Sequence, residues 1–334
     1  MKPKICITEK EFYKAETIFR QTHAFKCIPV SLQEDILAKA IIDNNAFAAV
    51  LGVEAFVDQL YSALPRGGII ARFGVGHDGL DKQKATEAGL IVTITPGALD
   101  DSVAEHAIWL MGALARQVAV HDNNMKSQKW QPSSGIELKE KTLLILGCGN
   151  IGRTVAKIAS FGLGMNVIAY DVVKLDAEQM KSQFGISRLL SNLDEAVAQA
   201  DFISAHLPAN KATKHFIGKD FLGKMRQDSF VINTSRGSIV DESALYDFLE
   251  SGKIAGAALD VFEKEPYIPV QANKDLRELP RILLTPHIAS GTVEACKRMA
   301  KSCLRNIKAA FDKKYNELDI VNSDVLKELS NEQS

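Results

Sequence analysis

Short apolar runs alternate along the chain with longer segments of helical periodicity. Runs rich in Val, Ile and Leu lie at 4–7, 47–53, 68–73, 90–95, 142–146, 166–170, 202–206, 230–233, 256–259 and 282–284. Most are continuously apolar rather than alternating, which is typical of strands buried on both faces of a parallel sheet. Helical patterns at 101–118, 151–161 and 243–249 lie between these runs. This rhythm predicts an α/β fold with doubly wound parallel sheets.

A final helix is predicted near the end of the chain. Its apolar positions recur at three- and four-residue spacing: Val293, Cys296, Met299, Cys303, Leu304, Ile307 and Phe311. Its other side is basic, which we interpret as a solvated face because the whole chain is nearly neutral. The polar segment after Asn322 predicts a frayed tail.

Length and charge narrow the possible classes of function. The 334 residues suggest about two domains of ordinary size. Lys and Arg number 40 against 41 Asp and Glu, so there is no basic excess for nucleic-acid phosphates or a membrane surface. No apolar run approaches the ~18 residues of a membrane span, and the N-terminus lacks a signal-peptide core. We therefore predict a protein without nucleic-acid or membrane partners.

The five cysteines are scattered and form no C-x-x-C pair. This pattern fits neither a disulfide framework nor a zinc site. Small buried thiols in a reducing compartment are the simpler interpretation. The cysteines thus predict a cytoplasmic protein, and we expect no metal site.

A glycine-rich turn follows the predicted strand at 142–146. Residues 147–152 read G-C-G-N-I-G, and a helical pattern begins directly after them. In a dinucleotide-binding turn the first glycine permits the tight turn, the second admits a pyrophosphate, and the third lets the helix pack on the strand. Backbone N–H groups at the helix start then meet the phosphates. The expected cofactor contacts here are Gly147, Gly149, Asn150, Ile151 and Gly152.

An acid follows the next strand at the spacing that a dinucleotide site requires. Asp171 comes 19 residues after Gly152 (171 − 152), where a carboxylate bonds the adenosine ribose hydroxyls. The same carboxylate would repel a 2′-phosphate, and Val172 and Val173 supply no cation, so NAD is favoured over NADP. The alternative is an unliganded turn with a surface acid, and the strand–turn–helix–strand–acid context favours the cofactor.

Three later apolar runs each lead into ionisable residues. They lead into Arg236, into Asp260 with Glu265 shortly after it, and into His287. In an open α/β sheet ligands bind beyond the carboxyl ends of the strands, so these side chains could converge on one crevice. Singly, each has a simpler explanation as a solvated arginine, a loop acid or a loop histidine. Only the set indicates a catalytic site.

From about residue 72 to residue 292 the chain resembles the D-isomer-specific 2-hydroxyacid dehydrogenases. The matching stretches are R-F-G-V-G-H-D-G-L-D (72–81), T-P-G-A-L-D-D-S-V-A-E-H (95–106), G-C-G-N-I-G (147–152), H-L-P (206–208), N-T-S-R-G-S-I-V-D-E (233–242), A-A-L-D-V-F-E-K-E-P (257–266) and T-P-H-I-A-S (285–290). They span roughly two thirds of the chain, and as a set they are specific to that family.

The resemblance implies a role for each matched position. Arg236 would hold the substrate carboxylate and C2 oxygen, which suits a guanidinium because it bonds two oxygens at once. His287 would be the general acid–base, and Glu265 would pair with it to keep the imidazolium available. The backbone of Val75 and Gly76 would also bind the carboxylate. The remaining NAD contacts would be Leu207, Pro208, Thr234, Asp260 and Ser290.

The resemblance also implies the domain plan. A flavodoxin-like substrate-binding domain would comprise residues 1–99 and 289–334, with a Rossmann NAD-binding domain inserted at 100–288. The long helix after Asp101 would contact a second copy in a homodimer. The expected activity is NAD-dependent reduction of a small 2-keto acid such as hydroxypyruvate or glyoxylate.

One departure from the family bears on the substrate. Phosphoglycerate-specific members carry an Arg just after the strand near Val50, whereas residues 50–54 here read V-L-G-V-E, with one acid and no cation. A phosphate would be poorly received there. A phosphoglycerate dehydrogenase and an NAD-sensing corepressor or scaffold of the same fold remain the alternatives.

Overall fold

The computed structural model describes residues 2–331, and the chain forms two compact units. The first comprises Met1–Leu99 and Ser290–Ser334, and the second comprises Asp100–Ala289. Both ends of the chain therefore contribute to one unit, and the second unit is inserted between them.

The first unit is built on a five-stranded sheet. Its strands are β1 (Lys4–Thr8), β2 (Lys26–Val30), β3 (Ala48–Leu51), β4 (Ile69–Arg72) and β5 (Ile91–Thr93). They are all parallel, in the order β2-β1-β3-β4-β5. This is the order of flavodoxin-like sheets.

Helices cover this sheet, and the last long one comes from the end of the chain. They are α1 (Glu9–Lys14), α2 (Glu16–Gln21), α3 (Glu34–Asn44), α4 (Gln59–Ala63), α5 (Lys82–Glu87), α13 (Val293–Phe311) and α14 (Val325–Asn331). The middle of the apolar stripe of α13 is buried against the sheet, and there the Cys303 thiol donates to the carbonyl oxygen of Arg72 at the end of β4. The two ends of the predicted stripe, Val293 and Phe311, are exposed. Asn322 accepts a hydrogen bond from the Val92 N–H at 2.8 Å, which ties the following segment to β5.

The second unit is built on a seven-stranded sheet. Its strands are β6 (Thr142–Leu146), β7 (Asn166–Tyr170), β8 (Ile186–Leu189), β9 (Phe202–Ala205), β10 (Phe230–Asn233), β11 (Gly256–Leu259) and β12 (Ile282–Leu284). All are parallel, in the order β12-β11-β10-β9-β6-β7-β8. This is the Rossmann order with one further strand. Two apolar clusters, one on each face, bury the central strands.

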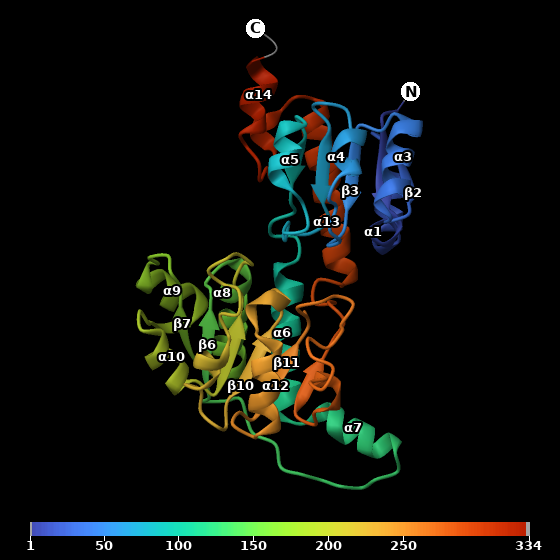
Figure 1. The fold of residues 1–334 in the computed structure, drawn as a ribbon. Helices are drawn as coiled ribbons and strands as arrows, with labels where there is room; N and C mark the ends of the chain where they lie inside the picture. The colour runs from blue at the N-terminus through green and yellow to red at the C-terminus, as the bar shows by residue number, and fades with distance from the viewer. Residues whose placement is uncertain (1, 332–334) are drawn as a thin grey trace. The chain divides into compact units, whose positions relative to one another are not determined.

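The helices of the second unit flank both faces of its sheet (Figure 1). They are α6 (Asp100–Ala115), α7 (Val118–Lys126), α8 (Asn150–Lys157), α9 (Ala177–Phe184), α10 (Leu193–Gln199), α11 (Lys219–Leu222) and α12 (Glu242–Glu250). A π-helical turn, Ile158–Gly162, extends α8. Among the described residues, no helix combines the length and the apolar character needed to cross a membrane.

The doubly wound architecture is confirmed, with three local differences. The strands β2 and β8 were not predicted. The single helix expected at 101–118 divides into α6 and α7, because Gln117 adopts a left-handed conformation with φ of 51°. The tail after Asn322 was expected to fray, yet it forms α14, and Val325 is buried.

Candidate active site

The glycine-rich turn joins β6 to α8, and its three glycines are required for different reasons. Gly147 has a φ of +91°, and a β-carbon there would lie 2.6 Å from the carbonyl oxygen of His206. A β-carbon on Gly152 would overlap the Gly147 carbonyl. At Gly149 no described atom lies within 4 Å of a β-carbon position, so the turn is open where α8 begins. This open turn at a helix N-terminus fits the pyrophosphate of a dinucleotide.

Asp171 lies directly after β7 and is bound to the glycine turn. Its Oδ2 accepts the Cys148 N–H at 2.7 Å, and its Oδ1 accepts the Val173 N–H at 2.8 Å. Each carboxylate oxygen keeps a second lone pair, so ribose hydroxyls can still bind. The residues of this region therefore fit an adenine dinucleotide.

A buried asparagine shapes the turn that carries Arg236. The Asn233 side chain ends β10 and is fully buried. Its Nδ2 donates to the Arg236 carbonyl at 2.8 Å, and its Oδ1 accepts from the Ser235 N–H and hydroxyl at 3.0 and 2.7 Å. Arg236 is half-buried, and its Nη1 donates to the Ser235 carbonyl at 2.6 Å. The guanidinium is thus held at the carboxyl end of β10.

The Arg236 turn packs directly on the loop that carries Glu265. A β-carbon on Gly237 would overlap the Phe262 carbonyl group, so the two backbones touch where glycine alone fits. The Glu265 Oε1 accepts the Phe262 N–H at 3.0 Å, which orients the carboxylate. The positions of Arg236 and Glu265 are consequently coupled through Gly237 and Phe262.

Glu265 and His287 form a close pair. The Oε2 of Glu265 lies 2.6 Å from Nδ1 of His287. A carboxylate can only accept, so Nδ1 carries the proton and Nε2 is the nitrogen left to exchange one. The two side chains are 31% and 26% exposed, which leaves them accessible to a small reactant.

The turn after β12 holds His287 in a strained backbone conformation. Its φ is +53°, in the left-handed region that residues with a β-carbon rarely adopt. The His287 N–H donates to the Asp260 carbonyl at 2.8 Å. The buried Asp260 carboxylate accepts the Ile288 and Ala289 N–H groups at 2.9 and 2.8 Å. Asp260 therefore fixes the turn that carries His287 through these three backbone hydrogen bonds.

The pKa of Asp260 reflects this environment. Burial alone would raise the pKa, but His106, at 3.5 Å, and the hydrogen bonds from Thr285, Ile288 and Ala289 outweigh it and hold the pKa below its usual value. Asp260 is therefore an anion at neutral pH.

The other predicted contacts lie at strand ends in both units. Leu207 and Pro208 follow β9, and the Thr234 hydroxyl after β10 is buried without a hydrogen-bond partner among the described residues. Val75 and Gly76 follow β4 and are partly buried. Ser290 belongs to the first unit, as they do.

Four residues at this edge of the second unit were not assigned a role from the sequence. The His106 Nε2 lies 3.1 Å from the Thr285 hydroxyl. Glu242 and Glu263 each accept the backbone N–H of the other, at 2.6 Å for the Glu263 N–H and 3.2 Å for the Glu242 N–H. All four lie within the stretches that resemble the family, and that was the available signal.

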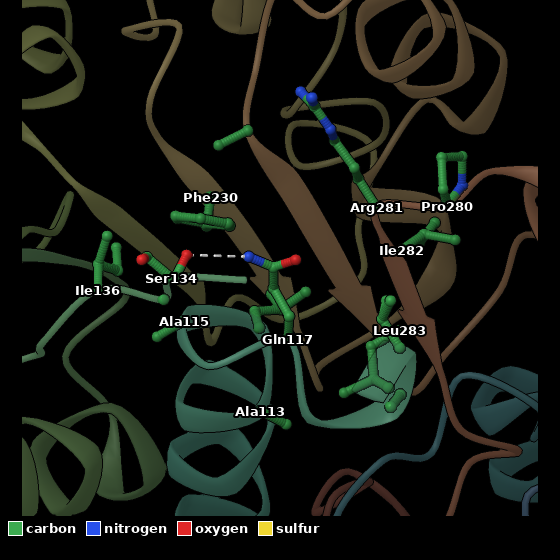
Figure 2. A pocket seen from close by; sticks show the side chains of 15 residues that line it. Ala113, Ala115, Gln117, Ser134, Ile136, Phe230, Pro280, Arg281, Ile282 and Leu283 are labelled. Carbon is green, nitrogen blue, oxygen red and sulfur yellow. Dashed lines mark hydrogen bonds between the residues drawn. The ribbon is translucent and has the colours of Figure 1, made fainter. Parts of the chain in front are cut away.

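A cavity of about 290 Å³ lies elsewhere in the second unit. Its lining comes from the segment that joins α6 to α7, from Ser134, and from residues at the amino ends of β10 and β12, including Phe230 and Arg281 (Figure 2). The Gln117 side chain donates to the Ser134 carbonyl across it. Because Arg236, Glu265 and His287 follow the opposite, carboxyl ends of the strands, this cavity is not part of their site.

Comparisons with known proteins agree on one family. Residues 108–289 match the NAD-binding domain of the D-isomer specific 2-hydroxyacid dehydrogenases. The chain is 41% identical to a hydroxypyruvate reductase of Thermotoga maritima (83% of this chain, 88% of the relative) and 37% identical to a glyoxylate reductase of Thermococcus litoralis (98% of each).

A solved structure has the same fold over nearly the whole chain. It is an NADPH-dependent glyoxylate/hydroxypyruvate reductase from Sinorhizobium meliloti in complex with NADP and malonate. Its TM-score is 0.79 at 26% identity, covering 93% of this chain and 94% of the other.

Proposed function

Because the chain belongs to the D-isomer-specific 2-hydroxyacid dehydrogenases, we propose that it reduces small 2-keto acids of the glyoxylate and hydroxypyruvate type with NADH. It is an oxidoreductase that acts on the CH–OH group of 2-hydroxy acids and uses a nicotinamide dinucleotide. The observation that carries the proposal is the pair of His287 and Glu265 at 2.6 Å. His287 follows β12 and Glu265 follows β11, which lies between β12 and β10, the strand that leads to Arg236.

In the proposed mechanism three side chains have distinct tasks. The Arg236 guanidinium binds the substrate carboxylate and C2 oxygen, since it offers parallel donors and a permanent charge. His287 gives the proton from Nε2 to the keto oxygen as that oxygen gains charge. Glu265 accepts from Nδ1 and thereby stabilises the protonated ring and fixes its orientation.

When bound, the nicotinamide supplies the hydride that reduces C2. The glycine turn would hold the pyrophosphate of the dinucleotide, and Asp171 would hold its adenosine ribose. The further contacts would be Leu207, Pro208, Thr234, Asp260 and Ser290. The open turn at Gly149 supports this assignment, as does the buried Thr234 hydroxyl, which has no hydrogen-bond partner in the part of the chain that the structure describes. We propose NADH over NADPH because the Asp171 carboxylate would repel a 2′-phosphate and the two valines that follow it supply no cation.

The first unit would select the substrate. We propose that the backbone at Val75 and Gly76 contributes to carboxylate binding. Near the carboxyl end of β3, Glu54 pairs with Lys10 at 3.4 Å, and a β-carbon on Gly52 would meet the carboxylates of both Glu11 and Glu54. Glu11 pairs with Lys14 at 3.2 Å in the same way, so both lysines near this strand end are already bound to acids. With no cation among residues 50–54 either, the site disfavours the phosphate of a phosphoglycerate dehydrogenase substrate and supports a small uncharged substituent.

The protein is further proposed to be a cytoplasmic homodimer. The five unpaired cysteines support a reducing compartment. For the dimer, α7 has no buried residue and stands away from its sheet (Figure 1), and Trp109 and Trp130 are 72% and 81% exposed. Apolar surface of this kind marks interaction sites. Light scattering, which measures the mass of the particle in solution, tests the proposed dimer by comparing the wild type with Trp109→Lys.

A substrate panel tests the activity. NADH oxidation is measured with glyoxylate, hydroxypyruvate, pyruvate and 3-phosphohydroxypyruvate, alongside NADH binding by fluorescence. We expect turnover with the small acids and little with the phosphorylated one. Binding of NADH without turnover of any keto acid would instead favour the NAD-sensing corepressor or scaffold.

A further inference from the structure

The turn that carries His287 is held almost entirely by one residue. Asp260 accepts the His287 N–H on its carbonyl and the N–H groups of Ile288 and Ala289 on its carboxylate. Thr285 donates its hydroxyl to the same carboxylate at 2.6 Å. Residue 286 is proline and has no N–H, so Asp260 collects every backbone donor from 286 to 289. The carboxylate thus anchors the two residues directly after His287, while the His287 N–H is shared between the Asp260 and Thr285 carbonyls at 2.8 and 3.0 Å.

A histidine on α6 completes this network. The His106 Nε2 lies 3.1 Å from the Thr285 hydroxyl and 3.5 Å from the Asp260 carboxylate. The single hydroxyl proton of Thr285 goes to Asp260, so the hydroxyl oxygen must accept from His106. Nε2 of His106 therefore carries a proton, and a directed chain runs from His106 through Thr285 to Asp260.

We infer that His106 is a positioning residue for the catalytic turn: its Nε2 proton orients the Thr285 hydroxyl and so fixes Asp260 beneath His287. Buried hydrogen-bond chains strengthen each bond in them, and an unpaired member destabilises the rest. The His106 ring is 20% exposed. It belongs to α6, whereas Arg236, Glu265 and His287 follow strands of the sheet. The inference rests on the proposed function only where turnover is used as a readout.

Two substitutions separate hydrogen bonding from packing. His106→Leu removes the donor and keeps much of the volume, whereas His106→Gln offers an N–H near the position of Nε2. We expect kcat to fall about 10-fold in the Leu variant, as for loss of a hydrogen bond to a charged group, and to recover mostly in the Gln variant. The dissociation constant of NADH should change little in either. Glu105→Gln, on the exposed neighbour in α6, is the matched control.

A measurement without substrate or cofactor tests the turn itself. Amide hydrogen exchange at 287–289 should accelerate about 10-fold in His106→Leu and stay near wild type in His106→Gln and Glu105→Gln. In a Thr285→Val background, His106→Leu should add less than it does in the wild type, because only the 3.5 Å contact between His106 and Asp260 remains.

These outcomes keep the two proposals distinguishable. If the wild type reduces none of the keto acids, the proposed function fails, and hydrogen exchange still decides the role of His106. Unchanged exchange in His106→Leu would overturn the inference. Equal impairment of the Leu and Gln variants would also overturn it, since the ring would then act only by filling space.

Discussion

The carboxyl edge of the seven-stranded sheet has two halves that are built differently. The half at β6 and β7, which we propose binds the cofactor (the cofactor half), consists of a glycine turn and one acid, Asp171, linked through backbone N–H groups. The half at β10 to β12, which we propose is catalytic (the catalytic half), consists of side chains from separate loops, joined by contacts such as the one between Gly237 and Phe262. Backbone recognition tolerates side-chain changes, whereas a side-chain network transmits them. Mutations should therefore affect the two halves unequally.

The largest effect is expected from Arg236→Ala, which should damage the catalytic half alone. Removing the guanidinium leaves the substrate carboxylate and C2 oxygen without their charged partner. We expect kcat/KM for keto-acid reduction to fall about 10³-fold, as for loss of a preorganised oxyanion donor. The dissociation constant of NADH, measured by fluorescence titration, should stay within a few-fold of wild type. Arg188→Ala on the edge strand β8 is the control, and equal losses of turnover and NADH binding would contradict the division.

Glu265→Gln should have the next largest effect. Both carboxylate oxygens act as acceptors, toward Phe262 and toward His287, and a glutamine has one acceptor oxygen only. Either the histidine or the loop loses its partner, and we expect kcat to fall about 10²-fold. Steady-state kinetics against Lys264→Gln, an exposed residue of the same loop, checks this. Wild-type turnover in Glu265→Gln would remove Glu265 from the mechanism.

Asp171→Ala should alter the cofactor half while sparing the chemistry. Loss of the carboxylate removes the ribose acceptor and the repulsion of a 2′-phosphate. We expect the ratio of kcat/KM for NADH to that for NADPH to fall about 30-fold, mainly through KM, as for a hydrogen-bonded charged group. Val172→Ala, at an exposed neighbour, is the control. An unchanged ratio would refute the ribose assignment.

The burial of each strand explains how much of the fold could be predicted. Central strands such as β6, β7 and β10 are buried on both faces, and their continuous apolar runs predicted their bounds. The two strands that were missed, β2 and β8, lie at sheet edges and contain polar or exposed residues. The break at Gln117 depends on backbone conformation, which periodicity does not report.

The proposed site could be derived from the sequence where its geometry is local. The glycine turn and Asp171 follow from spacing along two adjacent strands, and the resemblance supplied roles for Arg236, Glu265 and His287. No spacing predicted that His106 reaches Thr285, a residue 179 positions away, because only the folded sheet brings them together. The contact between Glu242 and Glu263 was missed for the same reason.

That last contact provides the smallest predicted effect, a change in stability with pH. Glu242 is 3% exposed, and its Oε2 is buried without a hydrogen-bond partner among the described residues. Burial, with the nearby charges of Glu263 and Glu265, raises the pKa of Glu242 to about 7 from 4.5. Between these values the native state holds a proton that the unfolded state lacks, so the free energy of unfolding falls as pH rises.

Glu242→Gln should remove that dependence while keeping the acceptor for the Glu263 N–H. The variant cannot ionise, so its stability relative to wild type should rise by about 1 kcal/mol from pH 6 to pH 8. Thermal unfolding at several pH values measures this, with Glu250→Gln, an exposed residue of α12, as the control. A stability difference that stays constant with pH would mean that Glu242 is already ionised at pH 6. The Glu242 carboxylate would then be a buried anion close to the charges of Glu263 and Glu265.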